Sequence, residues 1–203
     1  MSFICDICHS EFTLTPVILA KYPGWTPKKC SRCRKARSKP NTREENLTTA
    51  EVLKTFTEGP TTGVFTDGSA EPNPGPGGWG AVYVVGDQIL SEQHGHETAT
   101  TNNRMELSAL IAACKMVPRD QHAVMYTDSA LCVNTITAWA GKWAVNGWKK
   151  KGGEIKNLAL VQELYGLFHG HPGLEMKWIR AHAGNRWNEY ADSLATAYRR
   201  ETK

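Results

Sequence analysis

The feature that most constrains the fold is an alternation of strand-like and helix-like apolar segments between residues 63 and 199. Short runs of β-branched and aromatic residues predict strands at 64–66, 81–85, 123–127 and 175–179. Apolar residues at helical spacing predict helices at 105–116, 131–143, 158–169 and 187–199. The Gly- and Pro-rich stretch 67–80 is expected to be the long turn of a hairpin. This order predicts an α/β domain in which helices cover a sheet.

Length and composition argue against a membrane-spanning chain and against a single very small domain. The chain has 203 residues, of which 40% are hydrophobic and 22% charged, and its apolar runs are too short to span a bilayer. We therefore expect one ordinary domain with something small attached, no membrane partner, and a monomer. The first thirty residues lack the apolar stretch of a signal peptide, which predicts a cytoplasmic protein with reduced thiols.

Two C-x-x-C pairs, Cys5/Cys8 and Cys30/Cys33, are separated by a spacing typical of a zinc ribbon. Four thiolates at this spacing predict one structural Zn²⁺, which would supply the folding free energy that so short a segment lacks. Redox chemistry at the two pairs is the competing interpretation. The pattern of cysteines with Phe12, Tyr22, Gly24 and Pro27 resembles the small probable-zinc-ribbon family, which has no single function.

The excess of positive over negative charge lies in the N-terminal part of the chain. Residues 21–43 include nine Lys and Arg and no Asp or Glu. Such a run favours contact with phosphates, although a solvated charged surface or compensation for the metal site also fits. Residues 38–61 are rich in polar residues, and Thr48 and Glu51 predict a capping box at the start of a short helix. We therefore predict a zinc ribbon at 1–37, a linker with one short helix at 38–61, and the α/β domain at 62–203.

Four acidic residues stand at positions that could face one crevice. Asp67 and Asp128 each follow a predicted strand, and ligand sites in open α/β sheets gather at the carboxyl ends of strands. Glu106 falls in the first turn of its predicted helix, and Asp192 lies beside the apolar stripe of the last helix. Taken singly, each acid also fits a helix cap or an ordinary surface carboxylate.

Six sequence blocks follow one another in a fixed order. They are Thr66-Asp67-Gly68-Ser69, Asn73 to Gly80, Thr100 to Glu106, Thr127-Asp128-Ser129, His182-Ala183-Gly184 and Asn188-Glu189-x-x-Asp192. Between residues 62 and 198 this series resembles type 1 ribonuclease H. The resemblance implies a ribonuclease H-like five-stranded mixed sheet flanked by helices. It also implies endonucleolytic cleavage of the RNA strand of RNA/DNA hybrids to 5′-phosphate and 3′-hydroxyl ends.

By the same resemblance, Asp67, Glu106, Asp128 and Asp192 are catalytic residues that hold two Mg²⁺ ions, for which Mn²⁺ substitutes. Clustered acids repel one another until hard divalent ions enter, and Mg²⁺ prefers oxygen ligands. Two ions about 4 Å apart generate the attacking hydroxide and stabilise the leaving ribose oxygen. His182 matches the loop histidine of the family, which implies a role in proton transfer or in product departure.

The resemblance also implies which residues hold the hybrid. Asn73, Asn102 and Asn103 occupy the polar contact positions around the scissile strand. Trp139 and Trp143 match the channel of the DNA strand, although their spacing alone would also fit a core helix. Thr101 and Asn157 match a pocket for a DNA phosphate. The remaining candidates, which resemble a basic protrusion, are Lys142, Trp148, Lys149, Lys150, Lys151 and Lys156. Ala130 departs from the family pattern, in which glutamine is common, and this removes one RNA contact.

Three classes of function remain open. The leading one is a Mg²⁺-dependent endoribonuclease whose zinc ribbon adds affinity for nucleic acid. The second is a hybrid-binding module without catalysis, against which the presence of all four acids and His182 argues. In the third, the ribbon is a docking element for a protein partner.

Overall fold

The computed structural model describes residues 2–6, 10–21, 26–28, 30 and 47–201. The chain divides into two compact units, Met1–Glu45 and Asn46–Lys203. In the described residues, no helix combines the length and the apolar character that a membrane span needs.

The first unit contains a small antiparallel hairpin. Strand β1 (Ser2–Ile4) pairs with β2 (Glu11–Thr13), and the short helix α1 (Pro16–Ala20) follows. Cys5 and Cys30 are buried and pack with Phe12. The other two predicted zinc ligands, Cys8 and Cys33, lie outside the described residues. The described part thus brings one cysteine of each pair into the same small core.

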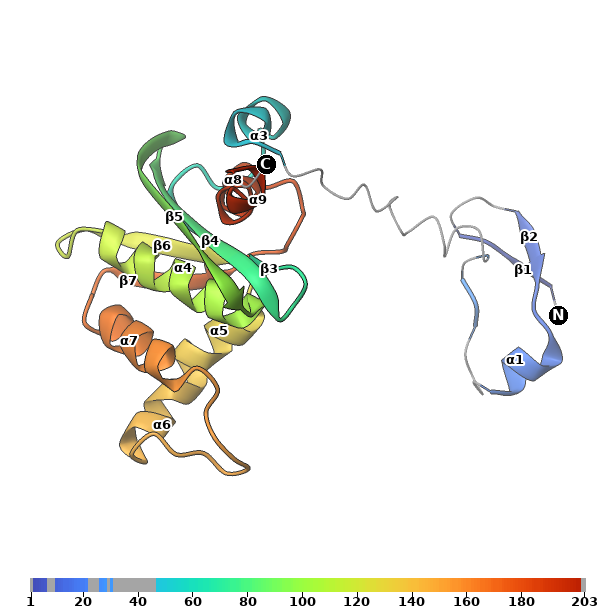
Figure 1. Ribbon diagram of the computed structural model, residues 1–203. Coiled ribbons are helices and arrows are strands. Elements are labelled where there is room, and N and C mark those ends of the chain that lie inside the picture. The colour runs from blue at the N-terminus through green and yellow to red at the C-terminus, as the bar shows by residue number, and fades with distance from the viewer. Residues whose placement is uncertain (1, 7–9, 22–25, 29, 31–46, 202–203) are drawn as a thin grey trace. The chain divides into compact units, whose positions relative to one another are not determined.

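The second unit is built on a five-stranded mixed sheet in the order β5-β4-β3-β6-β7, which confirms the predicted sheet (Figure 1). The strands are β3 (Gly63–Ala70), β4 (Gly75–Val85), β5 (Gln88–Thr100), β6 (Ala123–Thr127) and β7 (Leu174–Trp178). Strands β3, β4 and β5 are antiparallel neighbours, whereas β6 runs parallel to both β3 and β7.

Helices cover both faces of this sheet, and alternate residues of the central strands enter two separate cores. Val64 and Tyr83 face the core that includes α4 (Asn102–Met116), α5 (Ala130–Asn134) and α7 (Leu158–His169). Phe65 and Val82 face the core that includes α8 (Arg186–Ala195), which is followed by α9 (Tyr198–Glu201). Strand β3 is therefore buried on both sides, as a central strand of an α/β fold should be.

The expected long turn at 67–80 is wrong. Strand β3 continues through Asp67 to Ala70, and β4 begins at Gly75 rather than at residue 81, so the turn is confined to 71–74. Three glycines of this stretch, Gly68, Gly78 and Gly80, lie within strands at points where a helix backbone packs closely against the strand. A Cβ at Gly80, for example, would lie 2.5 Å from the carbonyl oxygen of Ala191 in α8. Gly here permits close packing and is not the mark of a turn.

Four other expectations also change. Strand β5, at the edge of the sheet, is not among the predicted strands. The single helix expected at 131–143 is three pieces, because the π-helical turn η1 (Thr135–Trp139) separates α5 from α6 (Ala140–Val145). The final helix ends at Ala195, before α9, rather than at residue 199. Helix α4 begins three residues earlier than expected, so Glu106 is its fifth residue and is not in the first turn.

The predicted short helix is present as α3 (Thr49–Thr55), and the capping box between Thr48 and Glu51 is formed on both sides. Instead of standing in a linker, α3 packs against α8 through the buried side chain of Val52 (Figure 1). Residues 47–61 are therefore a packed part of the second unit.

Candidate active site

The register of the parallel strands β3 and β6 places Asp67 and Asp128 side by side. Thr66 and Thr127 are the last partners of this pairing, and each is followed directly by one of the two aspartates. Asp67 nevertheless stays within β3, because that strand continues its pairing with β4 on the other side. Its side chain is almost completely buried.

Glu106 reaches this point because α4 crosses β3 at a glycine. A Cβ at Gly68 would lie 2.2 Å from the backbone nitrogen of Glu106, which is far closer than any real contact. The glycine thus allows the second turn of α4 to touch the strand that carries Asp67. One carboxylate oxygen from each of Asp67, Glu106 and Asp128 lies within 4.8 Å of the other two.

Asp192 comes from the opposite face of the sheet. Helix α8 lies against the glycines of β4, where a Cβ at Gly78 would meet the carbonyl oxygen of Ala195 at 2.3 Å. This close packing lets the Asp67 carboxyl group donate a hydrogen bond to Asp192. The structure therefore brings all four predicted carboxylates together from β3, α4, the end of β6, and α8.

Burial disfavours the charged form of all four carboxyl groups. Burial, followed by the neighbouring Asp192 and Asp128, raises the pKa of Asp67 well above its ordinary value. Burial and the charge of Asp67 raise the pKa of Glu106 well above its ordinary value too. Burial also raises the pKa values of Asp128 and Asp192, and the nearby His182 partly opposes both shifts.

This donor set fits a hard divalent cation. The ligands are oxygens alone, and the Oε2 atom of Glu106 is buried without a hydrogen-bond partner in the described part of the chain. A bound cation would satisfy that oxygen and would favour the ionised form of the four carboxyl groups, whose pKa values burial raises. A second group of ligand atoms within 4.8 Å of one another is formed by His182, Glu189 and Asp192.

His182 lies in the loop between β7 and α8, and its side chain is 58% exposed. Its backbone has a φ of 47°, a left-handed conformation that residues other than glycine rarely adopt. The Nδ1 atom is 3.8 Å from the Oε2 atom of Glu189, and the other carboxylate oxygen of Glu189 accepts a hydrogen bond from the Gly184 amide. Glu189 is itself buried, so α8 holds this loop from beneath.

Three residues of the site were not predicted. The buried Asn188 donates a hydrogen bond to the Asp128 carboxylate and so lowers its pKa. Glu189 contacts the loop of His182, as described above. The indole Nε1 of Trp178 donates to the Asp128 carbonyl oxygen at 2.9 Å, and its ring remains 54% exposed. The spacing of Asn188 and Glu189 before Asp192 was the available signal, whereas Trp178 gave none.

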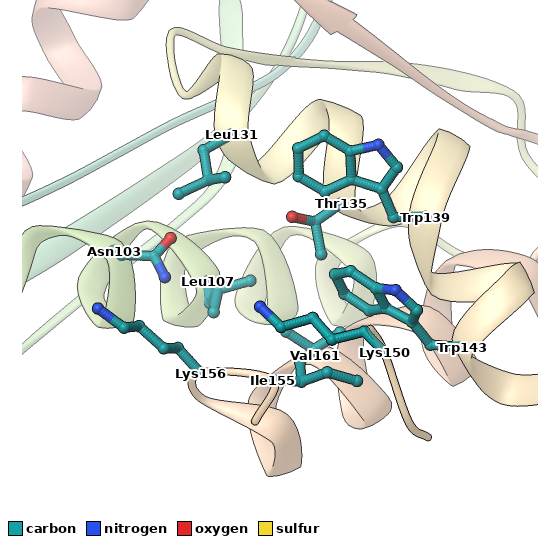
Figure 2. A pocket seen from close by; sticks show the side chains of 10 residues that line it. All are labelled: Asn103, Leu107, Leu131, Thr135, Trp139, Trp143, Lys150, Ile155, Lys156 and Val161. Carbon is teal, nitrogen blue, oxygen red and sulfur yellow. The ribbon is translucent and has the colours of Figure 1, made fainter. Parts of the chain in front are cut away.

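A pocket with a cavity volume of about 180 Å³ lies beside α4 (Figure 2). Trp139 and Trp143 form one wall, with ring centroids 6.1 Å apart, and the loop before α7 contributes Lys150 and Lys156. The ammonium group of Lys150 lies 6.0 Å from the ring centroid of Trp143. Asn103 also lines this pocket, so five predicted nucleic-acid contacts share one surface: Asn103, Trp139, Trp143, Lys150 and Lys156.

Other predicted contact residues have contacts within the protein. The side-chain oxygen of Asn102 accepts a hydrogen bond from the Ala70 backbone amide at 2.6 Å. The backbone amide of Asn102 donates a hydrogen bond to the side-chain oxygen of Asn73. These two asparagines thereby tie the β3–β4 turn to the start of α4. Thr101 is the N-cap of α4, and Asn157, with a φ of 55°, is the N-cap of α7.

The basic segment before α7 divides into buried and exposed residues. Trp148 packs against the core, with its ring at a right angle to that of Tyr165. Lys149 and Lys151 are exposed and do not line the pocket. Of the predicted protrusion, Lys150 and Lys156 line the pocket.

Comparison with known proteins identifies the family. The RNase H family model matches residues 60–200. A ribonuclease H of Methylorubrum extorquens (strain PA1) is 44% identical over 138 residues, which are 68% of this chain and 60% of that protein. The crystal structure of LC9-RNase H1, a type 1 RNase H with the type 2 active-site motif, is 35% identical with a TM-score of 0.59, over 72% of this chain and 76% of that one. LC11-RNase H1 in complex with an RNA/DNA hybrid is 25% identical with a TM-score of 0.50, over 66% of this chain and 93% of that one. The carboxylate cluster and these matches lead to one conclusion: the chain belongs to the ribonuclease H family of hydrolases.

Proposed function

We propose that this protein is an endoribonuclease that requires divalent metal ions and cleaves the RNA strand of RNA/DNA hybrids to 5′-phosphate and 3′-hydroxyl ends. The observation that carries the proposal is the convergence of Asp67, Glu106, Asp128 and Asp192 beside the central strands β3 and β6. Among the described residues, a buried oxygen of Glu106 has no hydrogen-bond partner. The names of the similar proteins, and the RNA/DNA hybrid bound to LC11-RNase H1, support the choice of substrate.

Each part of the site has a role in this proposal. Mg²⁺ ions, when bound by the four carboxylates, would supply an activated water and a positive charge near the leaving ribose oxygen. Asn188 fixes the orientation of the Asp128 carboxylate through its hydrogen bond. His182, on its exposed loop, accepts or returns a proton near the scissile bond or assists product departure. The aromatic and basic pocket beside α4 holds the DNA strand, because ring faces pack on sugars and bases while lysines pair with phosphates.

The test is cleavage of a labelled RNA/DNA hybrid beside matched duplex RNA and duplex DNA, with and without Mg²⁺. We expect cleavage of the hybrid alone, and only with Mg²⁺. The matched control variant is Asp120→Asn, which makes the same chemical change as Asp67→Asn at an exposed position outside the carboxylate cluster. Cleavage of the hybrid by the Asp67→Asn variant at the rate of the Asp120→Asn variant would refute the proposal.

We also propose that the first unit is a zinc ribbon that binds nucleic acid. Support comes from the burial of Cys5 and Cys30 together and from the basic run at residues 21–43. Removal of zinc with a chelator, followed by restoration of Mg²⁺, should weaken hybrid binding and flatten its dependence on salt, because each lost phosphate contact reduces the slope of log K against log salt by about 0.7 to 0.9. Unchanged affinity and slope would favour the alternative, in which the ribbon docks a protein partner.

A further inference from the structure

Residues 47–59, which we name the α3 segment, precede the residues that the family model matches. The segment consists of helix α3 and the residues on either side of it. Helix α3 packs against α8. Val52 is buried among Trp187, Tyr190 and Leu194, and the Ser193 hydroxyl donates to the Leu47 carbonyl oxygen at 2.6 Å. The α3 segment is therefore attached to the helix that carries Asp192.

The end of the same segment reaches the loop that carries His182. The Glu58 carbonyl oxygen accepts a hydrogen bond from the Arg186 amide at 2.8 Å, and Glu58 pairs with Asn185 in an isolated parallel bridge. Asn185 also lies against Gly59, where a Cβ would be 2.9 Å from its Oδ1 atom. The ring of Phe56 approaches Gly184, two residues from His182, with its Cδ1 atom 3.9 Å from the position of a Cβ there.

This loop needs support from its surroundings. The left-handed φ of 47° at His182 is unfavourable for any residue other than glycine. Such a conformation persists only when contacts with neighbouring residues stabilise it. Glu189 supports the loop from α8, and the α3 segment supports it from the other end at residues 184–186. Phe56 is the apolar part of that second support, because it also packs against the core beneath α8.

We propose that the α3 segment is a positioning element of the active site, and that Phe56 in particular holds the His182 loop in its working conformation. The inference rests on the proposed hybrid cleavage, since it concerns the rate of that reaction. It follows that the catalytic unit extends upstream of the residues that the family model matches, to residue 47. Removal of residues 1–60 would therefore disrupt the active site in addition to removing the zinc ribbon.

The experiment compares two variants of the full chain, Phe56→Ala and Phe168→Ala. Both replace a partly buried phenylalanine, but Phe168 lies on α7, in the other core, away from the carboxylates. We expect Phe56→Ala to lower kcat for hybrid cleavage by about 10- to 100-fold with little change in KM, because a displaced general acid or base loses much of its ~10² effect. Phe168→Ala should leave kcat within about twofold when both are assayed well below their melting temperatures.

Two further measurements separate positioning from loss of stability. In the Phe56→Ala/His182→Ala double variant, kcat should be no lower than in His182→Ala alone, because the phenylalanine acts through the histidine. Amide hydrogen exchange of a peptide spanning 180–186 should accelerate in Phe56→Ala and not in Phe168→Ala, whether or not the protein cleaves the hybrid. Should Phe56→Ala fold poorly, Phe56→Leu provides the milder test, and its kcat should lie between those of Phe56→Ala and the wild type.

Wild-type cleavage of the hybrid in the same assay tests the proposed function separately. An inactive wild type with accelerated loop exchange in Phe56→Ala would refute the function and keep the structural role of the segment. Additive effects of Phe56→Ala and His182→Ala on kcat would overturn the positioning role, as would unchanged exchange at 180–186.

Discussion

Addition of one methyl group at Gly68 should separate Glu106 from the other carboxylates. In Gly68→Ala, the new Cβ would lie 2.2 Å from the Glu106 nitrogen and 2.3 Å from the Met105 carbonyl carbon, whereas ordinary contact begins at 3.4 Å. Both atoms belong to the backbone of α4 and cannot rotate away as a side chain could. The helix must therefore move from β3 by about 1 Å, the scale at which misplacement of a catalytic group costs about 10²-fold in rate.

The same movement carries a cost in stability. Overpacking of a well-packed core costs about 1–3 kcal/mol, which for a chain of this size lowers Tm by roughly 3 to 10 °C. The assay is kcat for hybrid cleavage at saturating Mg²⁺, together with a thermal melt followed by circular dichroism. We expect kcat to fall by about 100-fold or more and Tm to fall within that range.

The matched control is Gly166→Ala, because Gly166 lies within α7 and a Cβ there would have no described residue within 4 Å apart from its chain neighbours and the backbone of its own helix. Alanine in a helix interior is favoured over glycine by about 1 kcal/mol, so this variant should keep its kcat and gain slightly in Tm. If Gly68→Ala instead kept kcat within about threefold and melted with the wild type, the close approach of α4 to β3 would not be what places Glu106.

Three other predictions concern the same site. Asp67→Asn should abolish cleavage yet bind the hybrid as tightly as the wild type or more so, because a metal ligand and a negative charge are lost together; a turnover above about a tenth of wild type under saturating Mg²⁺ would contradict this. His182→Ala should slow kcat by about 10²-fold with little change in KM, and a kcat equal to that of the wild type from pH 6 to 9 would exclude the proton-transfer role. Because the folded-state pKa values of all four carboxyl groups are raised, their contribution to stability is lost as pH rises through those values. Without divalent ions, Tm should therefore be lower at pH 8 than at pH 5, and the difference should be smaller in Asp67→Asn. Mg²⁺ should raise Tm more at pH 8 than at pH 5. Equal increases of Tm with Mg²⁺ at the two pH values would argue against metal binding by the four buried carboxyl groups.

Patterns that depend on neighbours along the chain were predictable. The capping box at Thr48 and Glu51, helix α7 and strand β6 all have the bounds or contacts that local spacing predicted. The four acids were found through the order of the sequence blocks, not through their chemistry, because each one alone resembles an ordinary surface carboxylate.

Features that depend on distant contacts were not predictable. Gly78 and Gly80 of β4 resemble part of a turn in sequence, and the backbone of α8 behind them explains why the strand has glycine there. Strand β5 lies at the sheet edge with most of its side chains exposed, so it lacks the apolar alternation that marks a half-buried strand. The contact of Trp178 with the Asp128 carbonyl joins residues fifty positions apart, which no local pattern encodes.

The π-helical turn at Thr135–Trp139 keeps the side chain of Trp143 in phase with the helix that precedes the turn. The Ala140 amide bonds to the Thr135 carbonyl, five residues back, so this turn contains one residue more than an α-helix would use. In a regular α-helix, the extra residue would rotate everything after it by about 100° relative to α5. Trp143 would then leave the pocket while Leu131 stayed. Deletion of one residue within the turn should therefore restore a regular helix and keep Trp143 in the pocket, whereas deletion of one residue at 140–142, in the α-helical segment after the turn, should rotate its ring away.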